Sequence, residues 1–356
     1  MGTLTRPLDE RIGARPVRRP AFTTPSRPTD GGRVVGVDLG GTWVRAGQFA
    51  ANGLIARRAT ERTQHGGGPQ LLVRQIGSLV REVSMPTLDA ETGPMTVAIG
   101  VPGPVDPAAG VVHAASNLPG WYEVPLRELL EANLGCRCLV EHDATLAALG
   151  EHRRGAGRGV ANFAYITVST GIGAGLILHN RIYRGGTGGS GEFGHVVVAP
   201  DGPLCDCGNR GCLDAVASGR AIARDAAAAS TADVGFAAAA GDQFAQAVLD
   251  AAARHLGLAL GGLVNLLNLE MIAVGGGVLG AGAHFWDRMV SGVAQGSFET
   301  VRQDCRIERA QLDDDQGLIG AFELASDILA EAASRSTGEP GVTPGDSVAQ
   351  GHWPPE

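Results

Sequence analysis

Residues Gly191 to Gly219, GEFGHVVVAPDGPLCDCGNRGCLDAVASG, carry the strongest structural signal in the chain. Cys205, Cys207 and Cys212 lie within eight positions there, and His195 precedes the first cysteine by ten residues. Thiolate and imidazole are the usual ligands of zinc, and a closed set of three Cys and one His is a common structural site. Gly and Asn between these residues allow the tight turns that such a site needs. The segment predicts a structural zinc ion; the alternative is three buried thiols or a disulfide.

Two acidic residues, Glu192 and Asp214, flank this cluster. A closed metal site has no open position for water, so the ion would have a structural role and cross-link the segment. Side chains beside such a cross-link are held rigidly. Glu192 and Asp214 are therefore candidates for binding a substrate.

Composition narrows the class of protein. The 356 residues suffice for two domains, and 54 glycines with 44% apolar residues suit an α/β protein. The formal net charge of −8 argues against a general nucleic-acid binder. We expect no membrane-spanning segment, because no apolar run is long enough, and no signal peptide. Cysteines used as metal ligands and core thiols favour a reducing cytoplasm.

All 29 cationic side chains are arginine, because the sequence contains no lysine. A Walker-A loop, a protein-kinase β3 lysine and a pyridoxal-phosphate Schiff base each require lysine. The absence of lysine therefore excludes these three chemistries. Any phosphate site must therefore use backbone amides, Arg and Mg²⁺.

Two glycine hairpins have the composition of phosphate-binding turns. In RVVGVDLGGTWVRAGQF (33–49), Asp38 ends a buried strand and Gly40, Gly41 and Thr42 form the turn. Backbone N–H groups of such a turn can bind an anion, and the adjacent carboxylate can hold Mg²⁺ through water. A single Gly-Gly turn is also common in ordinary hairpins.

The second hairpin, FAYITVSTGIGAGLIL (163–178), repeats this arrangement with Thr170, Gly171 and Gly173. Two such hairpins, each beginning a lobe, predict a duplicated fold that closes on a nucleotide. A third glycine turn, Gly275-Gly276-Gly277, ends the strand EMIAVGGG (270–277). It could admit a purine or its ribose, or be an ordinary turn.

Asp143 stands where a strand ending at Glu141 meets a helix. A carboxylate at the carboxyl end of a strand, in the crevice of an α/β sheet, is well placed to act as a base. The alternative is that Asp143 only caps the helix.

Residues EFGH (192–195) and CDCGNRGCL (205–213) resemble the signature of the ROK family (repressor, open reading frame, kinase). The resemblance extends over about residues 33–330, with the motifs in family order. It implies an actin-like, two-lobed α/β fold and the activity of an ATP-dependent sugar kinase, with Mg-ATP as cofactor and a homodimer as the assembly. The alternative class is a sugar-sensing regulator without enzymatic activity. The leader lacks room for a DNA-binding helix-turn-helix, which counts against a repressor.

The resemblance also implies roles for individual residues. Asp143 matches the catalytic base and Asn117 a sugar-contacting residue. Glu192, His195, His142 and Asp214 would surround the substrate hydroxyls, with His195 using one ring nitrogen for zinc and the other for substrate. His142 and Asp214 stand where sugar kinases of the family usually carry Asn and Glu. We therefore expect a shifted substrate, with an ordinary hexose, an amino sugar and a C7-cyclitol of the valiolone or valienone type all open.

The expected organisation has five parts. Residues 1–32 form a disordered leader, 33–145 a small lobe and 146–315 a large lobe. Residues 316–332 form a helix that returns to the small lobe, and 333–356 a disordered tail. We expect no nucleic-acid or membrane partner.

Overall fold

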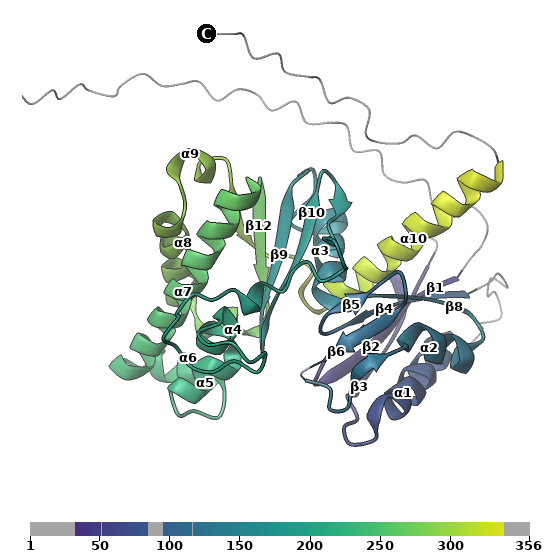
Figure 1. The fold of residues 1–356 in the computed structure, drawn as a ribbon, viewed down its shortest axis with the longest axis horizontal. Coiled ribbons are helices and arrows are strands. Elements are labelled where there is room, and N and C mark those ends of the chain that lie inside the picture. Colours follow the sequence, from purple (N-terminus) through teal and green to yellow (C-terminus); the bar gives the residue numbers. More distant parts are fainter. Residues whose placement is uncertain (1–32, 51, 85–94, 116, 338–356) are drawn as a thin grey trace, which may run out of the picture.

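The computed structural model describes residues 33–50, 52–84, 95–115 and 117–337. The predicted leader, 1–32, and residues 338–356 of the predicted tail lie outside this part of the chain. Two lobes stand side by side, with the strands β1 to β8 in one and β9 to β13 in the other (Figure 1).

Each lobe is built on a five-stranded sheet, and the two sheets have the same topology. Lobe 1 has the order β3 (Ile55–Arg62), β2 (Trp43–Phe49), β1 (Arg33–Leu39), β4 (Met95–Val101) and β8 (Arg137–His142). Lobe 2 has the order β11 (Arg181–Ile182), β10 (Ile172–Leu178), β9 (Phe163–Val168), β12 (Met271–Gly275) and β13 (Arg306–Arg309). In each sheet the first two pairings in this order are antiparallel and the last two parallel. The duplication expected from the paired hairpins is therefore present in the fold.

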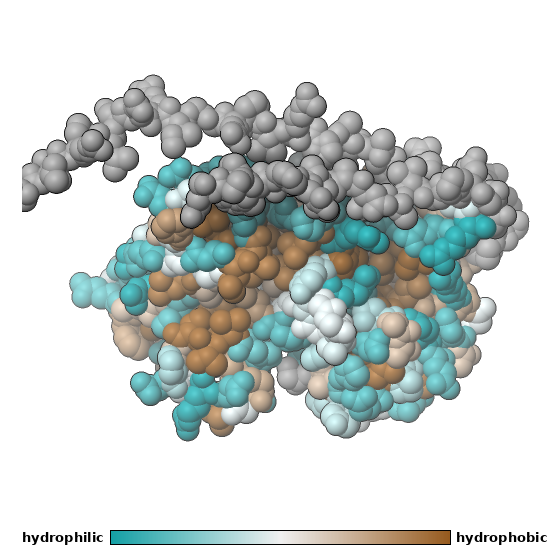
Figure 2. Space-filling view, turned by 45° about the horizontal axis from the view of Figure 1, so that its top comes forward, coloured by the Kyte–Doolittle hydropathy of each residue, from teal (hydrophilic) through white to brown (hydrophobic). Residues whose placement is uncertain are grey.

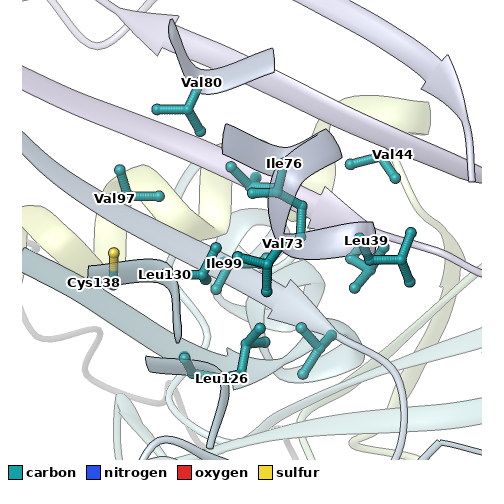
Figure 3. Close-up of a cluster of buried hydrophobic side chains, with 14 of the residues drawn as sticks. Leu39, Val44, Val73, Ile76, Val80, Val97, Ile99, Leu126, Leu130 and Cys138 are labelled. Carbon is teal, nitrogen blue, oxygen red and sulfur yellow. The ribbon is translucent and has the colours of Figure 1, made fainter. Parts of the chain in front are cut away.

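The core of lobe 1 lies between its sheet and the helices α1 (Gly68–Val83) and α2 (Leu126–Leu134). Helix α1 buries Leu72, Val73, Ile76, Leu79, Val80 and Val83, which recur at the spacing of one helical face. Figure 3 shows Val73, Ile76 and Val80 directed at strand residues such as Val97 and Ile99. A small sheet of β5 (Val105–Asp106), β6 (Val111–Ala114) and β7 (Tyr122–Val124) joins the same core.

Lobe 2 packs its sheet against a larger group of helices. The longest is α7 (Gln243–Leu267), which contacts α8 (Ala283–Gly296) and α6 (Thr231–Ala239). Shorter elements complete the lobe: η1 (Phe193–His195), α4 (Leu213–Ala217), α5 (Gly219–Asp225), η2 (Gly277–Ala281), α9 (Glu299–Arg302) and η3 (Asp313–Asp315).

Helix α7 is, within the described residues, the one helix long and apolar enough to cross a bilayer, judged by length and composition alone. The sequence pattern alone predicts no such segment. Half of its apolar window is buried inside the protein, and the helix packs against α4, α6 and α8. This is the environment of a core helix in a globular lobe.

Two helices join the lobes. Helices α3 (Asp143–Arg154) and α10 (Gln316–Thr337) pack on each other; α3 also contacts β9 and β10, and α10 contacts β1 and β4. They approach so closely that a Cβ added to Gly320 would lie 1.8 Å from the carbonyl oxygen of Leu146. Helix α10 continues beyond the predicted boundary at residue 332, and the predicted boundary at residue 145 falls inside α3.

Glu151, on α3, connects the two places where the chain passes between lobes. Its carboxylate is fully buried and accepts hydrogen bonds from the backbone N–H of Ala156 at 2.8 Å, Gln311 at 2.9 Å and Leu312 at 2.7 Å. Ala156 lies on the outgoing connection and the other two on the return. A buried carboxylate satisfied by three amides fixes this pivot between the lobes.

Candidate active site

Asp38 and Asp143 lie at the same edge of the lobe 1 sheet. Strands β1, β4 and β8 are parallel, and the register places Asp38 beside Gly100 and Gly100 beside Glu141. Asp143 follows two residues later, in the first turn of α3. The N-cap position belongs to His142, and no side chain caps the helix. Asp143 is therefore not the capping residue, which leaves its role as a base open.

Burial gives both carboxyl groups unusual pKa values. Burial, followed by the negative charge of Asp143, raises the pKa of Asp38 to about 6, although Arg45 opposes the shift from 3.3 Å. Burial raises the pKa of Asp143 to about 7, against the stabilising hydrogen bond from the backbone N–H of Ala144 at 2.6 Å. A base with a pKa near neutrality has the proton affinity that general base catalysis needs at physiological pH.

Groups from the two lobes face each other beside Asp143. The imidazole Nε2 of His142 lies 3.3 Å from Oδ1 of Asp143, whereas its Nδ1 is buried without a hydrogen-bond partner. Burial lowers the pKa of His142, and the nearby charges of Glu192 and Glu141 oppose that shift. Glu192 comes from lobe 2, so the structure brings it together with His142 and Asp143 across the lobes.

In the first hairpin, the carbonyl groups of the turn are engaged in hydrogen bonds with the segment that follows β3. Thr63 donates its hydroxyl to the Gly40 carbonyl at 2.7 Å and its N–H to the Thr42 carbonyl at 2.9 Å. His65 Nε2 lies 2.9 Å from the Gly41 carbonyl. Since carbonyl oxygens repel anions, engaging them favours anion binding by the amides of the turn.

The second hairpin shows the same arrangement. The carbonyls of Ser169 and Thr170 accept hydrogen bonds from the N–H groups of Gly219 and Arg220, at 2.8 and 3.5 Å, where α5 begins. The glycine turn at 275–277 lies beside this hairpin, because a Cβ on Gly276 would lie 2.3 Å from the Val168 carbonyl oxygen. The residues predicted around the phosphates are thus gathered on both lobes.

Asn117 and Gly173 occupy the margins of the same region. Asn117 is exposed and lies against the first hairpin, with its amide nitrogen 3.0 Å from a Cβ built on Gly41. A Cβ on Gly173 would lie 4.0 Å from the His142 ring. Asn117 therefore sits beside the hairpin of lobe 1, and Gly173 faces His142 from lobe 2.

Asp214 has a different environment from the one predicted. One carboxylate oxygen accepts the backbone N–H of Ile172 at 2.7 Å, and the other accepts Arg220 at 3.0 Å. The side chain is nearly buried. In this geometry Asp214 ties the second hairpin to α5, and a direct contact with substrate stays a prediction.

The four predicted zinc ligands converge. One ligand atom from each of His195, Cys205, Cys207 and Cys212 lies within 4.8 Å of all the others. The Cys205 Sγ to His195 Nδ1 distance is 3.6 Å, and the Cys207 Sγ to Cys212 Sγ distance is 3.7 Å. A tetrahedral zinc ion with ordinary bond lengths separates its ligands by about 3.6 Å (S to N) and about 3.8 Å (S to S). These residues therefore fit zinc, and the sulfur separation is too long for a disulfide.

The cluster reaches the predicted substrate region through His195. Its Nδ1 faces Cys205, and its Nε2 lies 3.7 Å from the carboxylate of Glu192. One ring nitrogen of His195 thus faces the cysteine cluster and the other faces Glu192; contacts of His195 with zinc and with substrate stay predictions.

A family comparison matches residues 34–328 to the model of the ROK family. The chain belongs to the ROK family. The resemblance seen in the EFGH and CDCGNRGCL segments is confirmed. So is the α/β fold, which is that of ROK sugar kinases with an actin-like ATPase architecture.

ROK glucokinases and hexokinases resemble the chain over nearly their whole length. A glucokinase from Thermotoga maritima is 34% identical over 316 residues, covering 83% of this chain and 98% of that protein. The structure of a ROK hexokinase from Thermus thermophilus is 34% identical, with a TM-score of 0.69, and covers 84% of this chain and 99% of its own. A Streptomyces griseus ROK glucokinase in complex with glucose and AMPPNP is 33% identical, with a TM-score of 0.71 and coverages of 82% and 98%.

Sequence reasoning missed two arginines at this ROK site. Arg45 lies between Asp38 and Asp314, at 3.3 and 3.5 Å. Arg184, from lobe 2, contacts the buried Glu141 at 2.7 Å. Arg45 follows the glycine turn by a few residues and could have been noticed there. No local pattern marks Arg184, because its partner lies 43 residues away.

Proposed function

We propose that this protein is an ATP-dependent kinase that transfers the γ-phosphate to a hydroxyl, expected to be a primary one, of glucose or a hexose-like polyol. Relatives named glucokinase and hexokinase support a phosphotransferase with an alcohol acceptor and ATP as donor. In this chain the proposal is carried by Asp143. Its pKa of about 7, and its place close to Asp38 at the carboxyl ends of the parallel strands of lobe 1, suit a general base.

Asp143 would accept the proton of the substrate hydroxyl as the oxygen attacks the γ-phosphorus and ADP leaves. The amides of Gly41 and Thr42, and of Thr170 and Gly171, would bind the phosphate oxygens. The N–H groups of Gly40 and Ile172 already donate to Trp43 and Asp214. Asn117, Glu192 and His195 would hold the substrate hydroxyls. Closure of the lobes about the Glu151 pivot would exclude water, which competes with the sugar as acceptor.

We also propose that Asp38 holds Mg²⁺. Carboxylate oxygen is the ligand type that Mg²⁺ prefers. Burial and then the negative charge of Asp143 raise the pKa of Asp38, and a bound cation would offset both effects. A bound Mg²⁺ would neutralise negative charge on the phosphates. Arg45, which pairs with Asp38, would keep this carboxylate ionised and in place.

The structural zinc ion is proposed on the ligand geometry of His195, Cys205, Cys207 and Cys212. It would fix the His195 ring, so that Nε2 stays beside Glu192 and available to a substrate hydroxyl. Zinc in such a closed site supplies stability and orientation and has no position for water.

The pH dependence of turnover follows from the Asp143 carboxyl group. Because its pKa is raised to about 7, the base is ionised only above that pH. We expect kcat/KM to rise with pH through about 7 and level off above it, falling about tenfold per pH unit on the acid side. Excess Mg²⁺ keeps the nucleotide from titrating in the same range. An acid limb centred near the ordinary aspartate pKa would contradict this role.

The substrate is proposed to be glucose first, since glucokinases are the relatives at about 34% identity. The comparisons do not favour the amino-sugar and C7-cyclitol alternatives, which remain as arms of the test. A coupled ADP-release assay with Mg-ATP should compare glucose, mannose, N-acetylhexosamines and valiolone-type cyclitols. Turnover on a cyclitol alone would move the substrate class away from hexoses.

His142 is the residue expected to set this preference. Its buried Nδ1 has no hydrogen-bond partner, so it can accept one from a substrate hydroxyl. We expect His142→Asn to change the ratio of kcat/KM between two polyols by about tenfold or more, the effect of one hydrogen bond. Asp214→Glu is the matched comparison. Because Asp214 already binds Ile172 and Arg220, the Asp214→Glu substitution should lower turnover on every substrate by a similar factor. An unchanged ratio in His142→Asn would remove His142 from specificity.

The ROK family also includes non-enzymatic repressors. If no sugar or cyclitol supports ADP release in the assay, the protein would be a sugar sensor instead of a kinase. In that case a sugar should still raise the melting temperature, while ATP hydrolysis never depends on it. The homodimer, the cytoplasmic location, and the lack of nucleic-acid and membrane partners stay predictions.

A further inference from the structure

An ion pair between a buried glutamate and a partly exposed arginine bridges the lobes beside the residues that precede Asp143. Glu141 lies on β8, at the edge of the lobe 1 sheet, and its side chain is 2% exposed. Arg184 follows β11, at the edge of the lobe 2 sheet. Its Nε donates a hydrogen bond to one Glu141 oxygen at 2.8 Å, and a terminal nitrogen lies 2.7 Å from the same oxygen. A charge-assisted hydrogen bond within a close ion pair to a buried carboxylate forms a strong and directional link.

The other oxygen of Glu141 acts on the catalytic turn itself. It accepts the backbone N–H of His142 at 3.0 Å. That amide belongs to His142, which occupies the N-cap position of α3 immediately before Asp143. The Arg184 guanidinium therefore connects to the β8–α3 turn through a single side chain.

Arg184 is itself firmly placed on lobe 2. The Ser190 N–H donates to the Arg184 carbonyl at 3.2 Å, and the Ala174 N–H of β10 donates to the Gly191 carbonyl at 2.9 Å. The segment between them touches lobe 1 again, since a Cβ on Gly188 would lie 2.6 Å from the Val105 carbonyl oxygen. This segment leads directly into Glu192, so the ion pair and the proposed substrate ligands share one short stretch of chain.

We propose that Arg184 is a positioning residue for phosphoryl transfer, which holds Glu141 and thereby sets the turn that carries Asp143 relative to the substrate ligands of lobe 2. This inference rests on the proposed function. Without Arg184, the buried carboxylate of Glu141 has lost its cation and turns toward water to remain ionised. This rotation releases the His142 amide, which Glu141 accepts at 3.0 Å, and displaces Asp143.

The test uses Arg184→Met, which keeps the length of the side chain and removes its charge. We expect kcat to fall by about 100-fold, the effect of misplacing a reacting group by about 1 Å, with KM for ATP changed less than about threefold. The double variant Arg184→Met with Glu141→Gln should recover kcat to within about tenfold of wild type, because a neutral amide can still accept from His142 without burying a charge. The double variant also tests the proposal if the single variant does not fold.

The matched control is Arg153→Met, which breaks the ion pair with Asp327 at 3.1 Å, between the two helices α3 and α10. Its kcat should stay within about twofold of wild type. Wild-type kcat in Arg184→Met, or no recovery in the double variant, would overturn the positioning role.

Hydrogen exchange separates this inference from the proposed function. A peptide that includes the His142 and Asp143 amides should exchange faster in Arg184→Met than in wild type, and should return toward wild type in the double variant. This readout needs no turnover. If wild type phosphorylates no polyol, the proposed function fails while the exchange data still decide whether Arg184 holds the turn. Unchanged exchange in Arg184→Met would refute the link.

Discussion

Replacing Asp143 with Asn is expected to abolish turnover while making the protein more stable at neutral pH. The amide keeps the shape of the side chain but cannot accept the substrate proton. General base catalysis contributes typically 10²–10⁴-fold, so we expect kcat to fall by about 10³-fold. The coupled ADP-release assay measures this loss, and binding of ATP should change little.

The expected gain in stability has a definite sign. The pKa of Asp143 is raised from 3.8 to about 7 in the folded protein. Between these values the folded state binds a proton that the unfolded state does not, so stability falls as the pH rises through this window. Asp143→Asn removes that penalty. Because 33% of the side chain is exposed to water, we expect a gain of about 1–2 kcal/mol rather than the full value of the shift.

Thermal unfolding of wild type and Asp143→Asn at about pH 8 and about pH 4 checks this expectation. The melting temperature of the variant should exceed that of wild type at the higher pH and match it at the lower. Zinc content should be unchanged, because Asp143 is not in the cysteine cluster. A variant that loses zinc and stability together would make Asp143 structural, and one that retains turnover would exclude it as the base.

Replacing Cys207 with Ser is expected to remove zinc and destabilise the whole segment. Cys207 is exposed, unlike the buried Cys205 and Cys212, so the change disturbs little packing and tests the ligand directly. Structural zinc contributes folding free energy outright. We expect on the order of 5 kcal/mol of lost stability, or about 10 °C in melting temperature, and zinc content well below one equivalent.

Loss of zinc should also weaken sugar binding more than ATP binding. His195 would no longer be held beside Glu192, whereas the hairpins of the phosphate site are held by their own hydrogen bonds. Cys305→Ser is the matched control, since Cys305 is a half-buried cysteine outside the cluster. It should keep full zinc content. Stoichiometric zinc with an unchanged melting temperature in Cys207→Ser would refute the proposal that Cys207 binds a structural zinc ion.

Much of the site could be predicted because its parts are local in sequence. Asp38 lies near the end of a short buried strand, Asp143 directly follows another, and parallel strands place their carboxyl ends at one edge of a sheet. The cysteines lie within eight positions, so a few tight turns bring their sulfurs together. The duplicated topology followed from two hairpins of the same composition.

Other features had no local sign. The N-cap of α3 is His142 and not Asp143, because the strand runs to the residue before the helix. The two carboxylate oxygens of Asp214 accept hydrogen bonds from Ile172 and Arg220, which the spacing of acidic residues does not indicate. The amphipathic pattern of α10 weakens toward its end, and the helix still continues to Thr337.

The sequence by itself determined the class of fold, the order of the motifs and the members of the Cys/His cluster, because periodicity, turn residues and close spacing act over a few positions. The tertiary structure decided which charges meet between the lobes. Glu141 and Arg184, and Glu151 with the amides of 311 and 312, are far apart along the chain and become neighbours only when two sheets and two helices pack. Burial then raised the pKa of Asp143, because desolvation depends on everything packed around a group and on no single neighbour in sequence.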